Sequence, residues 1–198
     1  MATGKYDITQ VLVENACKGD QKSAYKLYKM YVRAMYNVSI RIVANQLDAE
    51  DILQESFASA FQNLETYKGE VAFGAWLKQI VINKSINHVK KQKIWFTDTD
   101  CLPEMEDEIV ENDIWDDKIL GDISVEMIYD AIKTLPEKAR AVFSLYLLEG
   151  YRHKDIAEML DISVSTSKSQ YQRARKFLKE KLMRMISKKQ YKTICDEI

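Results

Sequence analysis

Apolar residues recur every three or four positions along most of this chain, the spacing that places them on one face of an α-helix. Only six Gly and two Pro interrupt that pattern, which favours a nearly all-α protein. We expect two small helical domains joined by a linker. The predicted helices cover residues 7–36 with a break at Gly19-Asp20, 38–64, 73–95, 124–135 and 136–150.

The helical pattern within residues 38–64 separates an apolar face from a polar edge. The apolar residues expected to point inward are Leu47, Ile52, Leu53, Phe57, Ala60 and Phe61. The polar edge consists of Asp48, Asp51, Gln54 and Glu55. Paired carboxylates are candidates for general acid–base chemistry. Here no histidine, serine nucleophile or glycine loop stands nearby in the sequence, so the edge predicts a docking surface for a basic partner rather than an enzyme.

Two short helical patterns separated by a tight turn follow between Tyr151 and Met185. Ser163 or Ser165 can cap the second of these helices by accepting from its free N–H groups. The buried positions are expected to be Ile156, Ala157 and Leu160, then Val164, Tyr171, Ala174, Leu178 and Met185. The opposite face of the second helix is polar and cationic: Thr166, Lys168, Ser169, Gln170, Gln172, Arg173, Arg175 and Lys176. The pattern predicts a helix-turn-helix, whose second helix fits the DNA major groove, with an amphipathic hairpin in a helical core as the alternative.

Charge is distributed unevenly along the chain. Residues 163–192 carry ten Lys or Arg and one acid, a local charge of +9 in a chain whose net charge is −1. This excess is typical of phosphate binding. Residues 97–122 carry eleven Asp or Glu and one Lys, a net charge of −10, and this composition predicts a linker.

A second basic segment, residues 78–95, carries five lysines and no acid. Asn83, Asn87 and Lys90 lie at i, i+4 and i+7 and share one helix face, with Lys84, His88 and Lys91 alongside. Carboxamides can hydrogen-bond base edges while lysines hold phosphates, so this helix also predicts contact with nucleic acid.

The cysteines and apolar segments limit the remaining possibilities. Cys17, Cys101 and Cys195 are far apart and contain no C-x-x-C, which favours a reducing cytoplasm and argues against zinc. His88 has no partner at metal-ligand spacing, so we expect no metal and no cofactor. No stretch approaches the length of a membrane span, and the first residues lack the apolar run of a signal peptide, so we expect no membrane insertion.

Four segments in this order, with the acidic linker between them, resemble the sigma factors of bacterial RNA polymerase, of the two-domain extracytoplasmic-function (ECF) type. The segments are D-A-E-D-I-L-Q-E-S-F (48–57), F-G-A-W-L-K-Q-I-V-I-N-K-S-I-N-H (73–88), L-P-E-K-A-R-A-V-F (135–143) and D-I-A-E-M-L-D-I-S-V-S-T-S-K-S (155–169). The resemblance implies a region 2 domain over 1–96, the acidic linker over 97–122, a region 4 domain over 123–186 and a C-terminal tail over 187–198.

The resemblance also implies a role for each polar surface. Core polymerase binding falls to Asp48, Asp51, Gln54 and Glu55. Recognition and melting of the minus-ten element fall to Lys68, Asn83, Lys84, Asn87, His88, Lys90 and Lys91. Reading of the minus-thirty-five duplex falls to Arg152, Ser165, Thr166, Lys168, Ser169, Gln170, Gln172, Arg173 and Lys176. The implied partners are core polymerase and promoter DNA, and an anti-sigma factor, which can be membrane-bound, is a further partner that the family allows.

Three residues depart from the family pattern. Ser167 stands where an apolar residue is usual, Gln170 where arginine is frequent, and Asp161 where the turn commonly has glycine. We expect Ser167 to alter the packing of its inward position and Gln170 to shift the preferred base from guanine toward adenine. A stand-alone helix-turn-helix regulator that binds duplex operator is the alternative function, although such a protein needs no second basic helix in its other domain.

Overall fold

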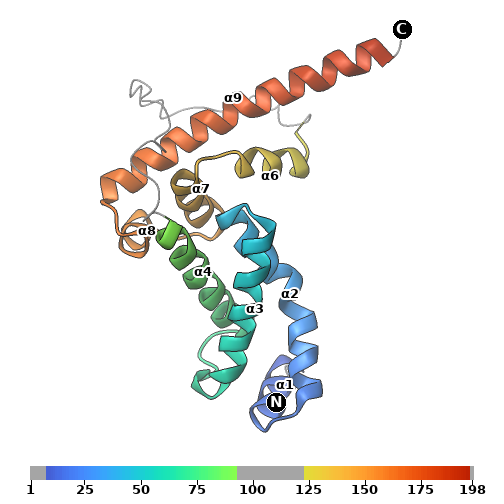
Figure 1. Cartoon of the computed structure of the whole chain (residues 1–198), viewed down its shortest axis with the longest axis vertical. Coiled ribbons are helices and arrows are strands. Elements are labelled where there is room, and N and C mark those ends of the chain that lie inside the picture. The colour runs from blue at the N-terminus through green and yellow to red at the C-terminus, as the bar shows by residue number, and fades with distance from the viewer. Residues whose placement is uncertain (1–7, 93–122, 197–198) are drawn as a thin grey trace, which may run out of the picture. The chain divides into compact units, whose positions relative to one another are not determined.

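The computed structural model describes the backbone of residues 8–92 and 123–196, and every regular element in these residues is a helix (Figure 1). The expected all-α fold is therefore confirmed. The chain divides into two compact units, residues 1–91 and 92–198, which are described separately below. The predicted acidic linker, 97–122, lies outside the described residues.

The described part of the first unit contains four α-helices and one short 3-10 turn. These are α1 (Ile8–Cys17), α2 (Gln21–Val43), α3 (Gln46–Gln62), the 3-10 turn Leu64–Thr66 and α4 (Phe73–Gln92). The predicted break at Gly19-Asp20 is present, because the Asp20 carboxylate accepts from the backbone N–H groups of Lys22 and Ser23, both at 3.2 Å. Fully buried side chains of α2 and α4, among them Leu27, Ile42, Leu77 and Ile82, form the core.

A second break separates α2 from α3, where the sequence pattern predicts continuous helix. Ala44 adopts a left-handed conformation with φ 55° and ends α2. Asn45 then caps α3, its side-chain oxygen accepting from the N–H groups of Leu47 at 2.9 Å and Asp48 at 3.3 Å. Local side-chain chemistry at Asn45 thus overrides the helical periodicity that runs through both segments.

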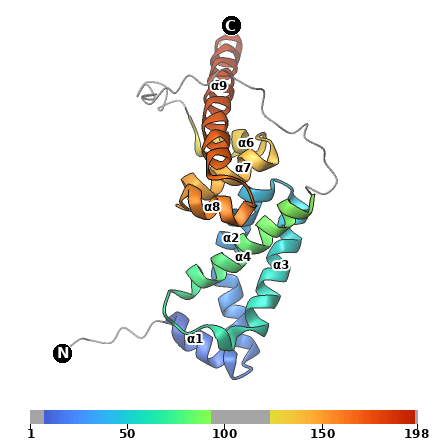
Figure 2. The ribbon, with the colours of Figure 1, turned by 90° about the vertical axis from the view of Figure 1, so that its left-hand side faces the viewer.

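The second unit consists of α6 (Val125–Lys133), α7 (Glu137–Phe143), a π-helical turn at Ser144–Leu148, α8 (His153–Leu160) and α9 (Val164–Asp196). Ser124 caps α6, and the chain after the π turn leaves the helix at Gly150, φ 78°, as predicted. The core is formed where α6 and α7 pack on α9 (Figure 2). Its buried members are Ala131, Ile132, Leu135, Ala139, Phe143, Ala174, Leu178 and Leu182.

One charged side chain lies inside this second core. Arg140 is 7% exposed, and its guanidinium donates to the backbone oxygen of Leu135 at 2.7 Å. Burial lowers the pKa of Arg140, and the nearby Glu137 carboxylate acts in the opposite direction. The guanidinium therefore holds the carbonyl at the end of α6 close to α7, which fixes the corner between these two helices.

The predicted helix-turn-helix is present as α8, a tight turn and the start of α9. Asp161 occupies the turn with φ 56° and ψ 51°, the left-handed conformation that glycine adopts most easily. Of the two candidate caps, Ser163 is the one that functions, because its Oγ accepts from the Thr166 N–H at 2.9 Å. The helix α9 continues to Asp196, through most of the expected C-terminal tail.

Candidate functional site

The polar edge predicted on α3 is divided between two environments. Asp51, Gln54 and Glu55 are exposed, whereas Asp48 is half-buried. Leu47 was expected to point inward, and this prediction is wrong, because the side chain is 72% exposed. The buried stripe of α3 begins at Ala49, and Leu47 lies two residues earlier, on the other side of the first turn. Leu47 instead shares a helix face with Asp51 and Gln54.

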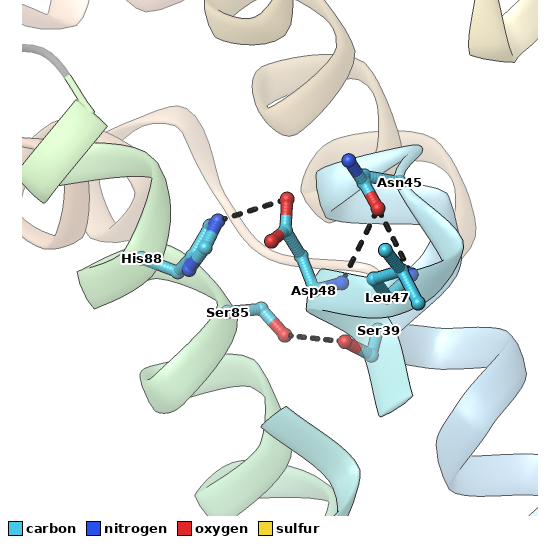
Figure 3. Close-up of polar contacts among 6 residues, drawn as sticks. All are labelled: Ser39, Asn45, Leu47, Asp48, Ser85 and His88. Carbon is cyan, nitrogen blue, oxygen red and sulfur yellow. Dashed lines mark hydrogen bonds and ion pairs between the residues drawn. The ribbon is translucent and has the colours of Figure 1, made fainter. Parts of the chain in front are cut away.

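The half-buried end of this edge faces α4, and Figure 3 shows the contact. Asp48 Oδ2 lies 3.3 Å from His88 Nε2, and each side chain is 27% exposed. About two turns further along α3 and one turn earlier on α4, Glu55 Oε2 lies 3.6 Å from Lys84 Nζ. Two residues predicted to bind polymerase are thus paired with two predicted to bind the minus-ten strand, which the sequence pattern did not indicate. The pairs hold α3 and α4 along one seam.

The seam rests on a small polar contact in the core of this unit. Ser85 Oγ of α4 donates to the backbone oxygen of Val81 at 2.8 Å and lies 3.3 Å from Ser39 Oγ of α2 (Figure 3). Both hydroxyls are fully buried. Serine has a small side chain, so α2 and α4 can approach closely, and the contact gives each buried hydroxyl a polar partner.

The outer face of α4 carries the carboxamides predicted to contact bases. Asn83, Asn87 and Lys91 are exposed at i, i+4 and i+8, while Lys84, His88 and Lys90 are half-buried beside them. The Asn83 side-chain oxygen accepts from the Gln79 amide at 3.0 Å. Such a bond within one helix turn limits the rotamers of Asn83 but leaves its NH₂ group able to donate.

The loop that precedes α4 is shaped by aromatic side chains. Tyr67 donates from its hydroxyl to the Val71 oxygen at 2.6 Å, and its ring contacts those of Phe73 and Trp76 at 5.6 and 5.4 Å. These contacts close the loop that carries the exposed Lys68. An open groove of about 740 Å³ separates this loop from α1.

In the helix-turn-helix, the buried stripe of α9 differs from the predicted one. Val164 is 41% exposed rather than inward, and Gln170 is only 9% exposed rather than on the outer polar face. Both corrections have one cause. The stripe follows Ser167, Gln170 and Ala174 at i, i+3 and i+7, so it is rotated from the one inferred through Val164 and Tyr171.

The remaining polar residues of α9 are accessible to different degrees. Ser165, Lys168, Gln172 and Lys176 are exposed, as is Arg152 before α8, while Thr166, Ser169, Arg173 and Arg175 are half-buried. The Arg173 Nε is buried and has no hydrogen-bond partner among the described residues.

Ser167 is fully buried, as predicted for its inward position, and sequence reasoning missed its partner. Its Oγ lies 3.0 Å from Nδ1 of His153, the first residue of α8. The imidazole stacks on Tyr146, with ring centroids 4.2 Å apart and an interplanar angle of 12°. The signal available in the sequence was the hydroxyl itself, because a buried hydroxyl requires a polar partner and the nearby histidine can supply one.

A helix-turn-helix in one unit and a separate cationic helix in the other are typical of DNA-binding proteins. Residues 27–94 match the family described as Sigma-70 region 2, and residues 125–178 match Sigma-70, region 4. The chain is 31% identical over 179 residues to the ECF RNA polymerase sigma-E factor of Haemophilus influenzae, covering 87% of this chain and 94% of that protein. It is 30% identical over 183 residues to the ECF RNA polymerase sigma-E factor of Escherichia coli strain K12, covering 89% and 95%.

The chain therefore belongs to the sigma-70 family, in its ECF group, and it directs RNA polymerase to promoters. This excludes the stand-alone regulator. Among solved structures, the sigma factor RpoE in complex with the anti-sigma factor NepR from Bartonella quintana is similar with a TM-score of 0.49 and 20% identity, covering 80% of this chain and 96% of that one. None of the helices in residues 8–92 and 123–196 has the length and apolar character that a membrane span requires.

Proposed function

We propose that the exposed face of α3 binds core RNA polymerase. Asp51, Gln54 and Glu55 present acidic and polar groups to solvent, and Leu47 adds an apolar side chain to the same face. Charged groups at an interface steer association and select partners. Burial of an exposed leucine side chain against a partner stabilises the complex. Asp48, which faces His88, acts by holding α4 in place rather than by reaching the polymerase.

The loop before α4 and the outer face of α4 bind the separated minus-ten strand in this proposal. Asn83 and Asn87 hydrogen-bond to bases, and Lys68, Lys84, Lys90 and Lys91, with His88, hold the strand beside them. Extruding a base from the duplex costs a few kcal/mol, which contacts to that base must offset. Support comes from the exposure of both carboxamides on one helix face, next to a loop whose shape is fixed by aromatic contacts.

The start of α9 reads the minus-thirty-five duplex. Its proposed contacts are Arg152, Ser165, Thr166, Lys168, Ser169, Gln172, Arg173 and Lys176. We assign Arg173 to a phosphate because it is a half-buried, not fully buried, cation on this segment. Gln170 is withdrawn as a direct base reader, since a side chain 9% exposed on the inner face of α9 does not reach the groove.

The observation that carries this assignment is the presence of two distinct cationic surfaces in one chain. The helix α4 contains four lysines and no acid, and residues 163–192 contain ten Lys or Arg and one acid. A protein that reads only duplex DNA has no use for the first surface. We further propose that the protein works in the cytoplasm without catalysing a reaction itself, and that an anti-sigma factor is a partner, as expected from the family.

The test is co-purification of the full chain with core polymerase, followed by run-off transcription from a library of randomised promoters. Transcripts that start downstream of two enriched elements, separated by a fixed spacer, are the expected result. Asp51→Lys should strongly weaken co-purification while circular dichroism stays helical, because an exposed carboxylate contributes little to the stability of its own domain. Normal co-purification of that variant would refute the α3 assignment.

A further inference from the structure

A hydrogen bond inside the helix-turn-helix joins its two helices at their starts. His153 is the first residue of α8, Ser167 is the fourth residue of α9, and Nδ1 and Oγ lie 3.0 Å apart. Ser167 is fully buried, so its side chain does not reach DNA bound on the outer face. The bond therefore acts between the two helices whose mutual placement decides what α9 presents to the groove.

The imidazole of His153 is held in place by rings from two other elements. Tyr146, in the π turn, stacks on it almost in parallel, at 4.2 Å. Tyr171, in α9, packs against Tyr146 at 4.5 Å and meets the imidazole edge-on at 5.8 Å. These two ring contacts restrict the orientation of the imidazole independently of its contact with Ser167.

A hydroxyl–imidazole bond restrains a helix in a way that an apolar contact does not. Burial of apolar area is non-directional and tolerates rotation, whereas a hydrogen bond weakens steeply as its angle departs from linearity. Thr166 and Lys168 flank Ser167, so any rotation of α9 about its axis moves both of these accessible residues.

We propose that the His153–Ser167 hydrogen bond sets the rotation of α9 and makes these two residues determinants of upstream promoter specificity without touching DNA. This inference rests on the proposed function. It means that two side chains that do not contact DNA influence which upstream sequence α9 reads. Where the family usually has an apolar residue, Ser167 forms a directional hydrogen bond.

The charge state of His153 fits such a bond. Burial, and then the positive charge of Lys168, lower the pKa of His153. The titratable groups that contact or influence the imidazole from the packed elements are Tyr146, Tyr171 and Lys168. A neutral imidazole has one donor and one acceptor nitrogen, and a hydroxyl can pair with Nδ1 in either role.

The test compares Ser167→Thr with Ser167→Val in the holoenzyme, using selection from promoters with a randomised upstream element. Both substitutions add the same branched bulk to a fully buried position, so crowding is common to both and only the hydroxyl differs. The Thr variant should select the wild-type motif. The Val variant should select an altered motif or bind the wild-type motif about fivefold more weakly than Thr. Equal motifs and equal affinities for Thr and Val would overturn the inference.

A second measurement decides the matter where the branched variants do not fold. The chain has two histidines, so ¹⁵N spectra of the wild-type imidazoles are simple, and His153→Phe assigns the signals. In the same spectra, Ser167→Ala should shift the ¹⁵N signal of His153 Nδ1, because that nitrogen loses its hydrogen-bond partner. Unchanged His153 signals in Ser167→Ala would overturn the proposal.

Failure of the proposed function has a different signature. In that case the wild-type holoenzyme enriches no upstream motif, which refutes both the proposed duplex reading by α9 and the present inference. When only the present inference is wrong, the wild-type protein selects a motif and both variants share it.

Discussion

Truncation of Leu47 to alanine should weaken polymerase binding without weakening the fold. Full burial of a leucine side chain stabilises a complex by about 1.5–3 kcal/mol. Leu47 is 72% exposed, so roughly three quarters of that free energy is still available to an interface. The expected loss on truncation is about 1–2 kcal/mol, a rise in Kd of about 5- to 30-fold. The free energy of unfolding should change by less than about 0.5 kcal/mol, since the side chain makes little contact in the free chain.

The assay is titration of labelled protein with core polymerase, alongside thermal unfolding of the free chain. Ile8→Ala is a matched control, because Ile8 is 71% exposed and lies on α1 rather than α3. The control should bind like the wild type. The reasoning is refuted if both variants bind core polymerase equally well, or if Leu47→Ala lowers the unfolding temperature enough to explain its weaker binding.

Four other outcomes are expected. Gly74→Ala should lower the free energy of unfolding by about 1–3 kcal/mol in chemical denaturation, because its new Cβ would meet the Tyr31 ring at 2.7 Å. Asn45→Ala should cost about 1 kcal/mol in the same measurement, since α3 loses its cap. Asn83→Ala should slow promoter opening, and a pre-melted template should rescue the melting defect. Equal losses on pre-melted and duplex templates would confine the role of Asn83 to base readout. The pKa of His153 in the folded chain lies below its ordinary value of 6.5, so the unfolded chain binds more protons. The free energy of unfolding should therefore fall as the pH drops below about 6.5, and it should fall less steeply in His153→Phe.

Periodicity and local capping chemistry account for what the sequence predicts well. The breaks at Gly19-Asp20 and Gly150 carry their own signals, a carboxylate cap and a glycine with positive φ, and both are present. The break before Asn45 was missed because apolar residues keep their helical spacing across it. A single asparagine cap is a weaker signal than the periodicity of two long helices.

Side-chain exposure at helix ends was the least predictable feature. Leu47 and Val164 lie in the first turns of α3 and α9, and both fall off the buried stripe of their helix. Gln170 was placed on the outer face because it is polar, yet the rotation of α9 is set by Ser167 and Ala174. Ion pairs between α3 and α4 join positions more than 25 residues apart, and no local pattern reports such pairs.

The pairing of α3 with α4 has a consequence for the ions around the protein. Lys84 already faces Glu55 at 3.6 Å, and His88 faces Asp48 at 3.3 Å. Where a DNA phosphate takes Lys84, the strand releases a condensed cation, but the Lys84–Glu55 ion pair must break, and salt weakens that pair as well. Ionic strength should therefore affect strand binding by the free chain less than its number of lysines suggests. If polymerase engages Glu55 as proposed, that compensation disappears, and the holoenzyme should hold the strand with the steeper salt dependence of an unpaired lysine.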